Sequence, residues 1–158
     1  MTEISALKGK LREDVISSVQ SEVYEAAEKA LKEAIQQTMY AGGGGAYYAR
    51  TGDFLNAIKI EDKRNTGSSA EFTVIVRGSM LSPQMNDGDM WNAHMDVYGN
   101  AWNTDGLVEV MDEGTKSHSL YMHKGYHFYD KAELDMDKEL VRVLARALRG
   151  RGWDVQIV

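Results

Sequence analysis

The sequence predicts an α+β fold: a small antiparallel sheet with a long N-terminal helix and a C-terminal helix packed against it. Three observations lead to this prediction. Apolar residues recur at helical spacing from about Ile4 to Tyr40, a stretch without proline. Two β-rich segments follow, Ile58–Glu61 and Phe72–Arg77, with a polar turn between them that is typical of a hairpin. A second amphipathic helix is expected from about Asp130 to Leu148.

Length and composition place the chain among ordinary globular domains. We predict one domain over all 158 residues, with the long helix over 1–41 and the α+β core over 47–158. The net charge of -6 argues against a general nucleic-acid binder, whose surface is basic. No apolar run approaches the roughly 18 residues of a membrane span, and the start lacks the features of a signal peptide, so no membrane partner is expected. The absence of cysteine removes disulfides and thiolate chemistry and fits assembly in the cytoplasm.

The N-terminal helix is long for a chain of this size. If continuous, it would extend roughly 50 Å, which exceeds what one small domain can cover with its own core. Two interpretations stay open: the helix breaks near Gly9 with a frayed first turn, or one end lies against a neighbouring subunit. Gly42–Gly45 ends the helix. This glycine run is not followed by the Lys-Ser/Thr pair of a phosphate-binding loop, so nucleotide binding is rejected.

The middle of the chain is less regular. Residues 79–89 include Pro83 and predict an exposed loop, and the alternation of Met90–Tyr98 predicts a half-buried strand. Asp105–Met111 fits either a short helix or a strand. We favour the helix because Thr104 or Asp105 can cap it.

The C-terminal helix is expected to bury one apolar face and to expose a basic one. The apolar positions are Leu134, Val141, Leu144 and Leu148. The basic stripe comprises Lys138, Arg142, Arg146 and Arg149, which suits either contact with DNA phosphates or an acidic partner, or simple complementarity to the helix dipole. Gly150 and Gly152 end the helix, and Trp153–Ile157 alternates as a terminal strand would.

The segment Tyr47–Leu55 forms the corner between the long helix and the sheet. Thr51 is the expected N-cap of a short helix, Asp53 favours its positive end, and Phe54 gives it an apolar side. Gly52 suits a close backbone approach. Arg50 precedes the cap and has donors for a carboxylate, such as Glu109 or Glu113 of the same subunit, or one on a neighbour.

This corner resembles that of the head–tail joining (tail-completion, or neck) proteins of long-tailed bacteriophages. The resemblance begins with an aromatic segment, Arg50-Thr51-Gly52, the acid Asp53 and the apolar Phe54. A second landmark of that family, an acid followed by Gly-Thr, corresponds to Glu113-Gly114-Thr115 within Val110–Thr115. Aromatic residues at Tyr126–Tyr129 and a final amphipathic helix follow in the same order, so the resemblance covers roughly residues 47 to 150.

The resemblance implies a structural protein of the virion neck, located in the virion and, during assembly, in the host cytoplasm. It implies a homo-oligomeric ring between a portal-side head-closure protein and a tail protein, with DNA only passing through the lumen. It also implies no catalytic turnover and no cofactor.

Two other classes of function stay open. A small metal-dependent hydrolase would need His118, His123 and His127 to bind zinc with nearby Glu113 or Asp130. Gly125 argues against a helix that presents both His123 and His127, so we expect no bound metal. The other alternative is a non-virion adaptor protein that binds peptides at a sheet edge.

Overall fold

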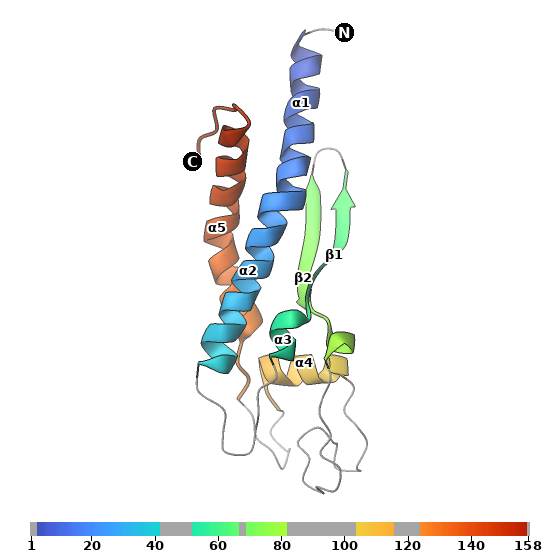
Figure 1. Ribbon diagram of the computed structural model, residues 1–158, viewed down its shortest axis with the longest axis vertical. Coiled ribbons are helices and arrows are strands. Elements are labelled where there is room, and N and C mark those ends of the chain that lie inside the picture. Colours follow the sequence, from blue (N-terminus) through green and yellow to red (C-terminus); the bar gives the residue numbers. More distant parts are fainter. Residues whose placement is uncertain (1–2, 42–51, 67–68, 82–103, 116–123, 158) are drawn as a thin grey trace, which may run out of the picture.

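The computed structural model describes residues 3–41, 52–66, 69–81, 104–115 and 124–157. These residues form the predicted α+β fold, in which a two-stranded antiparallel sheet and the two long helices pack in layers. The N-terminal helix lies between the sheet and the C-terminal helix (Figure 1). Short helices close the end of the molecule that is opposite to both termini.

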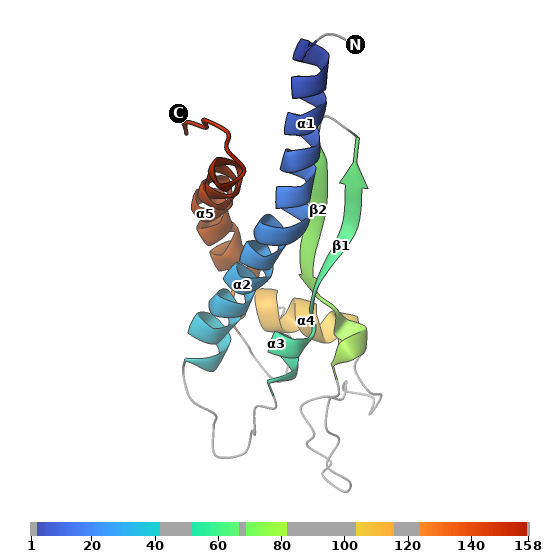
Figure 2. The same cartoon turned by 45° about the horizontal axis from the view of Figure 1, so that its top comes forward.

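The N-terminal helix runs without a break from Glu3 to Tyr40. It consists of α1 (Glu3–Ser18), the π-helical turn η1 (Val19–Val23), α2 (Tyr24–Ile35) and a second π turn, η2 (Gln36–Tyr40). Of the two interpretations left open for this helix, the break near Gly9 is wrong. Gly9 lies inside α1, and one glycine in an exposed helix costs only about 1 kcal/mol relative to alanine. The helix changes direction at η1 instead (Figure 2), as helices commonly do at π turns.

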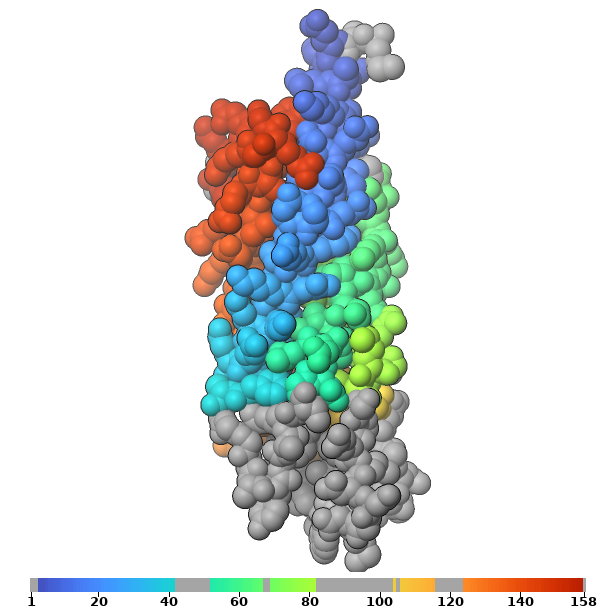
Figure 3. Space-filling model, in the orientation of Figure 1, coloured from blue at the N-terminus to red at the C-terminus, as the bar shows by residue number. Residues whose placement is uncertain are grey.

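The two parts of this helix differ in burial. α2 supplies the centre of the core, where Ala27, Leu31, Ala34 and Ile35 are completely buried. In α1, by contrast, the only buried residue is Ser18. The first turns of α1 extend past the rest of the molecule (Figure 3). The first part of α1, up to about Glu13, is therefore an arm that the body of the same chain leaves exposed, whereas Asp14 and Ser17 contact the C-terminal segment.

The predicted hairpin is confirmed. It pairs β1 (Ile58–Asn65) with β2 (Ala70–Val76), and Ile58 lies opposite Val76. A bulge between Glu61 and Arg64 interrupts the register. α2 packs against both strands, and a 3-10 turn, η3 (Gly78–Met80), follows β2 at the start of the predicted 79–89 loop. Leu81 of the predicted exposed loop is instead buried in the core. Residues 82–89 of that loop and the predicted strand Met90–Tyr98 lie outside the described residues.

Both helices expected in the second half are present. α4 (Thr104–Glu113) confirms the helical interpretation of Asp105–Met111, and α5 (Phe128–Gly150) confirms the C-terminal helix.

The predicted apolar face of α5 is wrong in part. Leu134 and Val141 are 61% and 52% exposed, whereas the buried residues of α5 are Phe128, Ala132, Ala145 and Leu148. α5 contacts α2, η1 and α1, and these elements do not share one axis. The face of α5 that meets the long helix therefore changes along its length, and Leu134 and Val141 stay outside.

The C-terminal segment is not the predicted strand. α5 ends at a left-handed Gly152 (φ 89°), whose N–H donates to Arg149 O while the Trp153 N–H donates to Leu148 O. This pair of bonds is a Schellman motif and confirms the expected glycine stop. Beyond it, the Trp153 indole donates to Asp14 Oδ2 (2.8 Å), and the Arg149 guanidinium donates to Val155 O. These bonds hold the segment against α1 and α5, so its alternation does not produce a strand in the described sheet.

Candidate functional site

Phe54 of the first landmark segment and Phe128 of the aromatic segment 126–129 meet at one corner of the fold. This corner comprises α3 (Asp53–Asn56), the last turn of α4, the first turn of α5 and the end of β2. Phe54 and Phe128 are both buried there, and their rings meet edge to face with centroids 6.3 Å apart. Residues far apart in sequence therefore share one part of the core.

Gly52 begins α3 and occupies the N-cap position that was predicted for Thr51. Its φ of 79° is in the left-handed region that glycine adopts without strain. A Cβ at Gly52 would meet nothing within 4 Å, so backbone conformation rather than close approach explains this glycine. Asp53 and Phe54 follow in the first turn as expected, whereas Arg50 and Thr51 lie outside the described residues.

Asp112 joins the end of α4 to the start of α5. The residue is 9% exposed, and its Oδ1 accepts the Tyr129 N–H at 3.1 Å. Its main-chain carbonyl accepts the His127 N–H at 2.9 Å. The N-cap residue of α5, His127, makes no side-chain cap hydrogen bond. The carboxylate of Asp112 therefore supplies, from another helix, the acceptor that a free helix N-terminus requires.

Gly125 permits this close contact between the two segments. Its φ is 77°, and an added Cβ would lie 2.4 Å from Asp112 O and 2.5 Å from Glu113 C. No other residue fits without a shift of the main chain. The positive φ of Gly125 and of His127 also keeps this stretch out of a helical conformation, as expected for the segment between His123 and His127.

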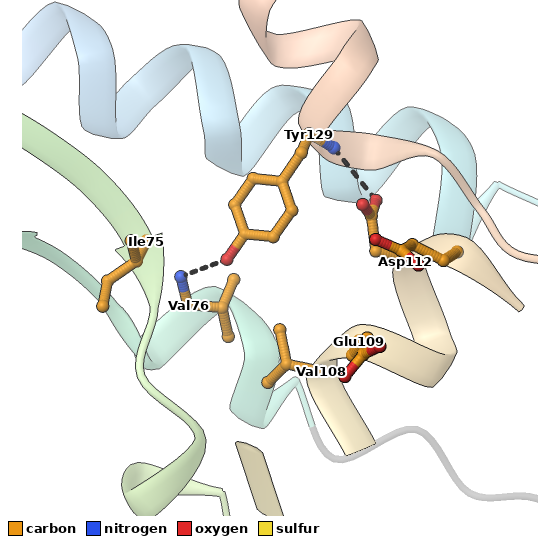
Figure 4. Close-up of a pocket in the computed structure, with 7 residues that line it drawn as sticks. Ile75, Val76, Val108, Glu109, Asp112 and Tyr129 are labelled. Atoms are coloured by element: carbon orange, nitrogen blue, oxygen red, sulfur yellow. Dashed lines mark hydrogen bonds between the residues drawn. The ribbon is translucent and has the colours of Figure 1, made fainter. Parts of the chain in front are cut away.

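A pocket of about 290 Å³ opens between β2, α4 and the first turn of α5 (Figure 4). Ile75, Val76 and Val108 form apolar walls, and three acids at its lining are Glu109, Asp112 and Glu113. Apolar walls beside carboxylates suit a basic side chain, whose alkyl part packs while its charge is neutralised. The lining of this pocket includes neither a histidine nor a serine, so it lacks the usual pairing of a nucleophile with a base.

Tyr129 spans the pocket and connects α5 to the sheet. Its hydroxyl accepts the Val76 N–H at 2.8 Å (Figure 4). Burial raises the pKa of Tyr129, and the charge of Asp112 raises it further, while the Val76 N–H acts in the opposite direction. The raised pKa favours the neutral phenol, whose oxygen accepts the Val76 N–H at the end of β2.

The other predicted site residues fall into three groups. Glu113 lines the pocket, and Gly114 and Thr115 follow directly after α4. Lys138, Arg142 and Arg146 are exposed along α5, as a contact stripe requires. The Arg149 guanidinium, by contrast, donates hydrogen bonds to the carbonyl oxygen of Val155 within the same chain.

The zinc site that the hydrolase alternative would need is untested. His118 and His123 lie outside the described residues. His127 is described, and its Nδ1 lies 3.7 Å from Asp130 Oδ2 at the surface. Within the described ranges, no group of three potential ligands is close enough to hold a metal ion.

Sequence reasoning missed Asp112 as the connecting residue and Tyr129 as the anchor of β2. One signal for Asp112 was available, because it lies four residues after Val108 on the apolar side of α4, where an acid requires a partner. The partner of Tyr129 lies 53 residues away in the sequence, and no local pattern indicates it.

No protein-family model, curated protein or solved structure matches this chain. Among the helices in the described part of the chain, none is both long and apolar enough to span a bilayer. Function is therefore inferred from the residues themselves and from their arrangement.

Proposed function

We propose that the protein is a structural component of the neck of a long-tailed bacteriophage. It forms a homo-oligomeric ring that joins a portal-side head-closure protein to a tail protein, and DNA passes through the ring. The resemblance of Arg50–Phe54 and of Glu113–Thr115 to this family supports the proposal. In this role the protein turns over no substrate and requires no cofactor.

The main observation behind the proposal is the uncovered arm. On α1, Ile4 is 67% exposed, Leu7 is 58% exposed and Leu11 is 38% exposed. Apolar side chains on one exposed helix face gain free energy when a neighbour removes them from water. A chain that leaves such a face uncovered is suited to assembly with other subunits.

The landmark residues have structural roles that agree with a protein without turnover. Phe54 packs in the core and Gly52 begins α3, while Asp112, which directly precedes the second landmark, caps α5. Each of these contacts shapes the body from which the arm extends. Their chemistry supports an assembly role better than catalysis.

A deletion in the phage that encodes the protein tests the virion role. We expect lysates to contain DNA-filled heads and complete tails that are not joined, and expression of the protein from a plasmid to restore joined particles. Electron microscopy of both lysates measures the fraction of heads that are joined to tails. Normal joined and infectious particles in the deletion strain would overturn the proposal.

Two measurements on the purified protein separate the alternative functions. Elemental analysis that finds about one zinc ion per chain would favour the hydrolase that uses His118, His123 and His127. Light scattering that finds only monomers or dimers, both alone and with isolated heads or tails, would favour the adaptor protein. We expect higher oligomers and no stoichiometric zinc.

A further inference from the structure

The exposed large apolar residues of the described part of the chain gather on two helix faces. One is the arm stripe, which we define as Ile4, Leu7 and Leu11 of α1. Their spacings of three and four residues place them on one side of the helix. The other is the α5 patch, which we define as Leu134 and Val141, 61% and 52% exposed. Outside these two faces, only Met80 and Ile157 belong to the same class.

The two faces match in spacing. Ile4 and Leu11 are seven residues apart, and so are Leu134 and Val141. Seven residues correspond to about 10.5 Å along a helix, or close to two turns. Two apolar residues of one helix can therefore lie opposite two of the other, as they do in helix pairs with a seven-residue repeat.

The charges beside the two faces determine the direction of pairing. In α1, Glu3 lies beside Ile4, while Lys8 and Arg12 lie near Leu11. In α5 the acids outnumber the bases around Leu134, where Asp130, Glu133, Asp135 and Asp137 accompany Lys131 and Lys138. Around Val141 the two signs balance, with Asp137 and Glu139 beside Lys138 and Arg142.

A parallel pairing would place Arg12 beside Arg142 and Glu3 beside Glu133. An antiparallel pairing places Leu11 on Leu134, so that Arg12 meets the acids of α5 and Glu3 meets Arg142. The excess of acids around Leu134 therefore favours the arrangement that brings Lys8 and Arg12 to it, and the parallel arrangement lacks this attraction. The described residues thus favour the antiparallel pairing.

We propose that the arm stripe of one copy packs antiparallel on the α5 patch of the next copy. This inference rests on the self-association in the proposed function and identifies the surfaces that mediate it. Each copy contributes one arm and receives another, so the contact is head-to-tail rather than symmetric.

The proposed contact also fixes the relative orientation of the copies. Within one copy, α1 runs away from the N-terminal end of the molecule, and α5 returns toward it (Figure 1). An antiparallel contact between copies therefore keeps all copies pointing the same way but shifts them along the molecule, because Leu134 lies 17 residues before Arg151, which contacts Asp14 of α1 in the same copy. Because the arm extends past the body, successive copies tilt or step along the molecule, and the size of the step decides between a ring and an open helix.

The absence of cysteine makes this contact directly testable. Single-cysteine variants are mixed in pairs and oxidised, and the disulfide-linked heterodimers are quantified. The antiparallel pairs are Leu11→Cys with Leu134→Cys, and Ile4→Cys with Val141→Cys. We expect these to cross-link at least several-fold faster than the parallel pairs, Leu11→Cys with Val141→Cys and Ile4→Cys with Leu134→Cys.

A matched control comes from the opposite side of the arm. Glu13 is exposed on α1, nine residues from Ile4 and so about 180° around the helix. The pair Glu13→Cys with Leu134→Cys should therefore cross-link at the background rate. Faster cross-linking of the parallel pairs, or of Leu11→Cys with itself, would overturn the proposed contact.

A second experiment measures assembly without cross-linking. Leu134→Glu adds a charge to the α5 patch, whereas Met80→Glu adds one at an exposed residue outside both faces. In sedimentation velocity, we expect Leu134→Glu to lose the oligomer that the unchanged protein and Met80→Glu form, with similar thermal unfolding in all three. An oligomer that Leu134→Glu does not weaken would refute this contact but not the ring. A protein that stays monomeric at every concentration would refute both, and the phage deletion tests the virion role separately.

Discussion

Tyr129→Phe deletes the hydroxyl through which α5 hydrogen-bonds to the end of β2. The Tyr129 hydroxyl accepts the Val76 N–H at 2.8 Å, and Val76 is only 4% exposed. After the substitution the N–H keeps its place in the core and loses its acceptor. A buried polar group without a partner costs about 1–3 kcal/mol. Urea unfolding, followed by circular dichroism, should show a loss of this size without a change in the slope of the transition.

Tyr24→Phe is the matched control for this substitution. The Tyr24 ring packs against Phe72, with ring centroids 4.8 Å apart. Its hydroxyl makes no hydrogen bond with any residue in the described part of the chain. The same chemical deletion should therefore change the free energy of unfolding by less than about 0.5 kcal/mol. Equal losses in Tyr129→Phe and Tyr24→Phe would refute the role assigned to the Tyr129 hydroxyl.

The pH dependence of the same pair provides a second check. Burial, followed by the charge of Asp112, raises the pKa of Tyr129 above its ordinary value of 10.0. The folded protein thus holds this proton more tightly than the unfolded chain does. The resulting stability is complete below about pH 10 and is lost as the pH rises through the raised pKa. The difference in stability between the unchanged protein and Tyr129→Phe should therefore shrink in alkaline solution.

Three further substitutions test other parts of the structure by urea unfolding at neutral pH. Gly125→Ala should lower the free energy of unfolding by roughly 3–5 kcal/mol, because it combines left-handed strain with a clash against main-chain atoms. Gly52→Ala should lower it by only about 1–2 kcal/mol, because strain acts there alone. Equal losses would contradict the close approach at Gly125. Ser18→Ala removes a buried hydroxyl without a hydrogen-bond partner and should leave stability unchanged or raise it by about 1 kcal/mol, so a clear loss would indicate an unrecognised role. Trp153→Phe removes the indole bond to Asp14 and should cost about 1–2 kcal/mol; no loss would mean that this bond does not hold the C-terminal segment.

The elements that the sequence predicted well depend on local and repeated patterns. The long helix, the hairpin and α5 each have a periodicity that neighbouring residues determine. Periodicity shows which residues share a face, but not whether the same chain covers that face. For this reason Leu134 was assigned to the interior, although it lies at the surface.

The parts that sequence could not predict depend on distant partners. Trp153–Ile157 alternates like a strand, but a strand also needs an open sheet edge, and the Asp14 carboxylate and the Arg149 guanidinium bind this segment first. The candidate site was found through its landmark residues, whereas its connections through Asp112 and Tyr129 become visible only in three dimensions. Arg50 lies outside the described residues, so its pairing with Glu109 or Glu113 stays a prediction.

The π turn η1 also determines how far α1 is rotated about its axis relative to α2. Apolar residues recur at every fourth position along the long helix: Val15, Val19, Val23, Ala27, Leu31, Ile35 and Met39. In a regular α-helix each step of four residues turns by about 40° beyond a full circle, so this series would wind away from the core. From Val19 to Met39 all its members are buried, because the wider turns η1 and η2 offset part of that rotation. Removal of one residue from η1 would turn α1 by about 100° relative to α2 and direct the same apolar side chains toward a different neighbour.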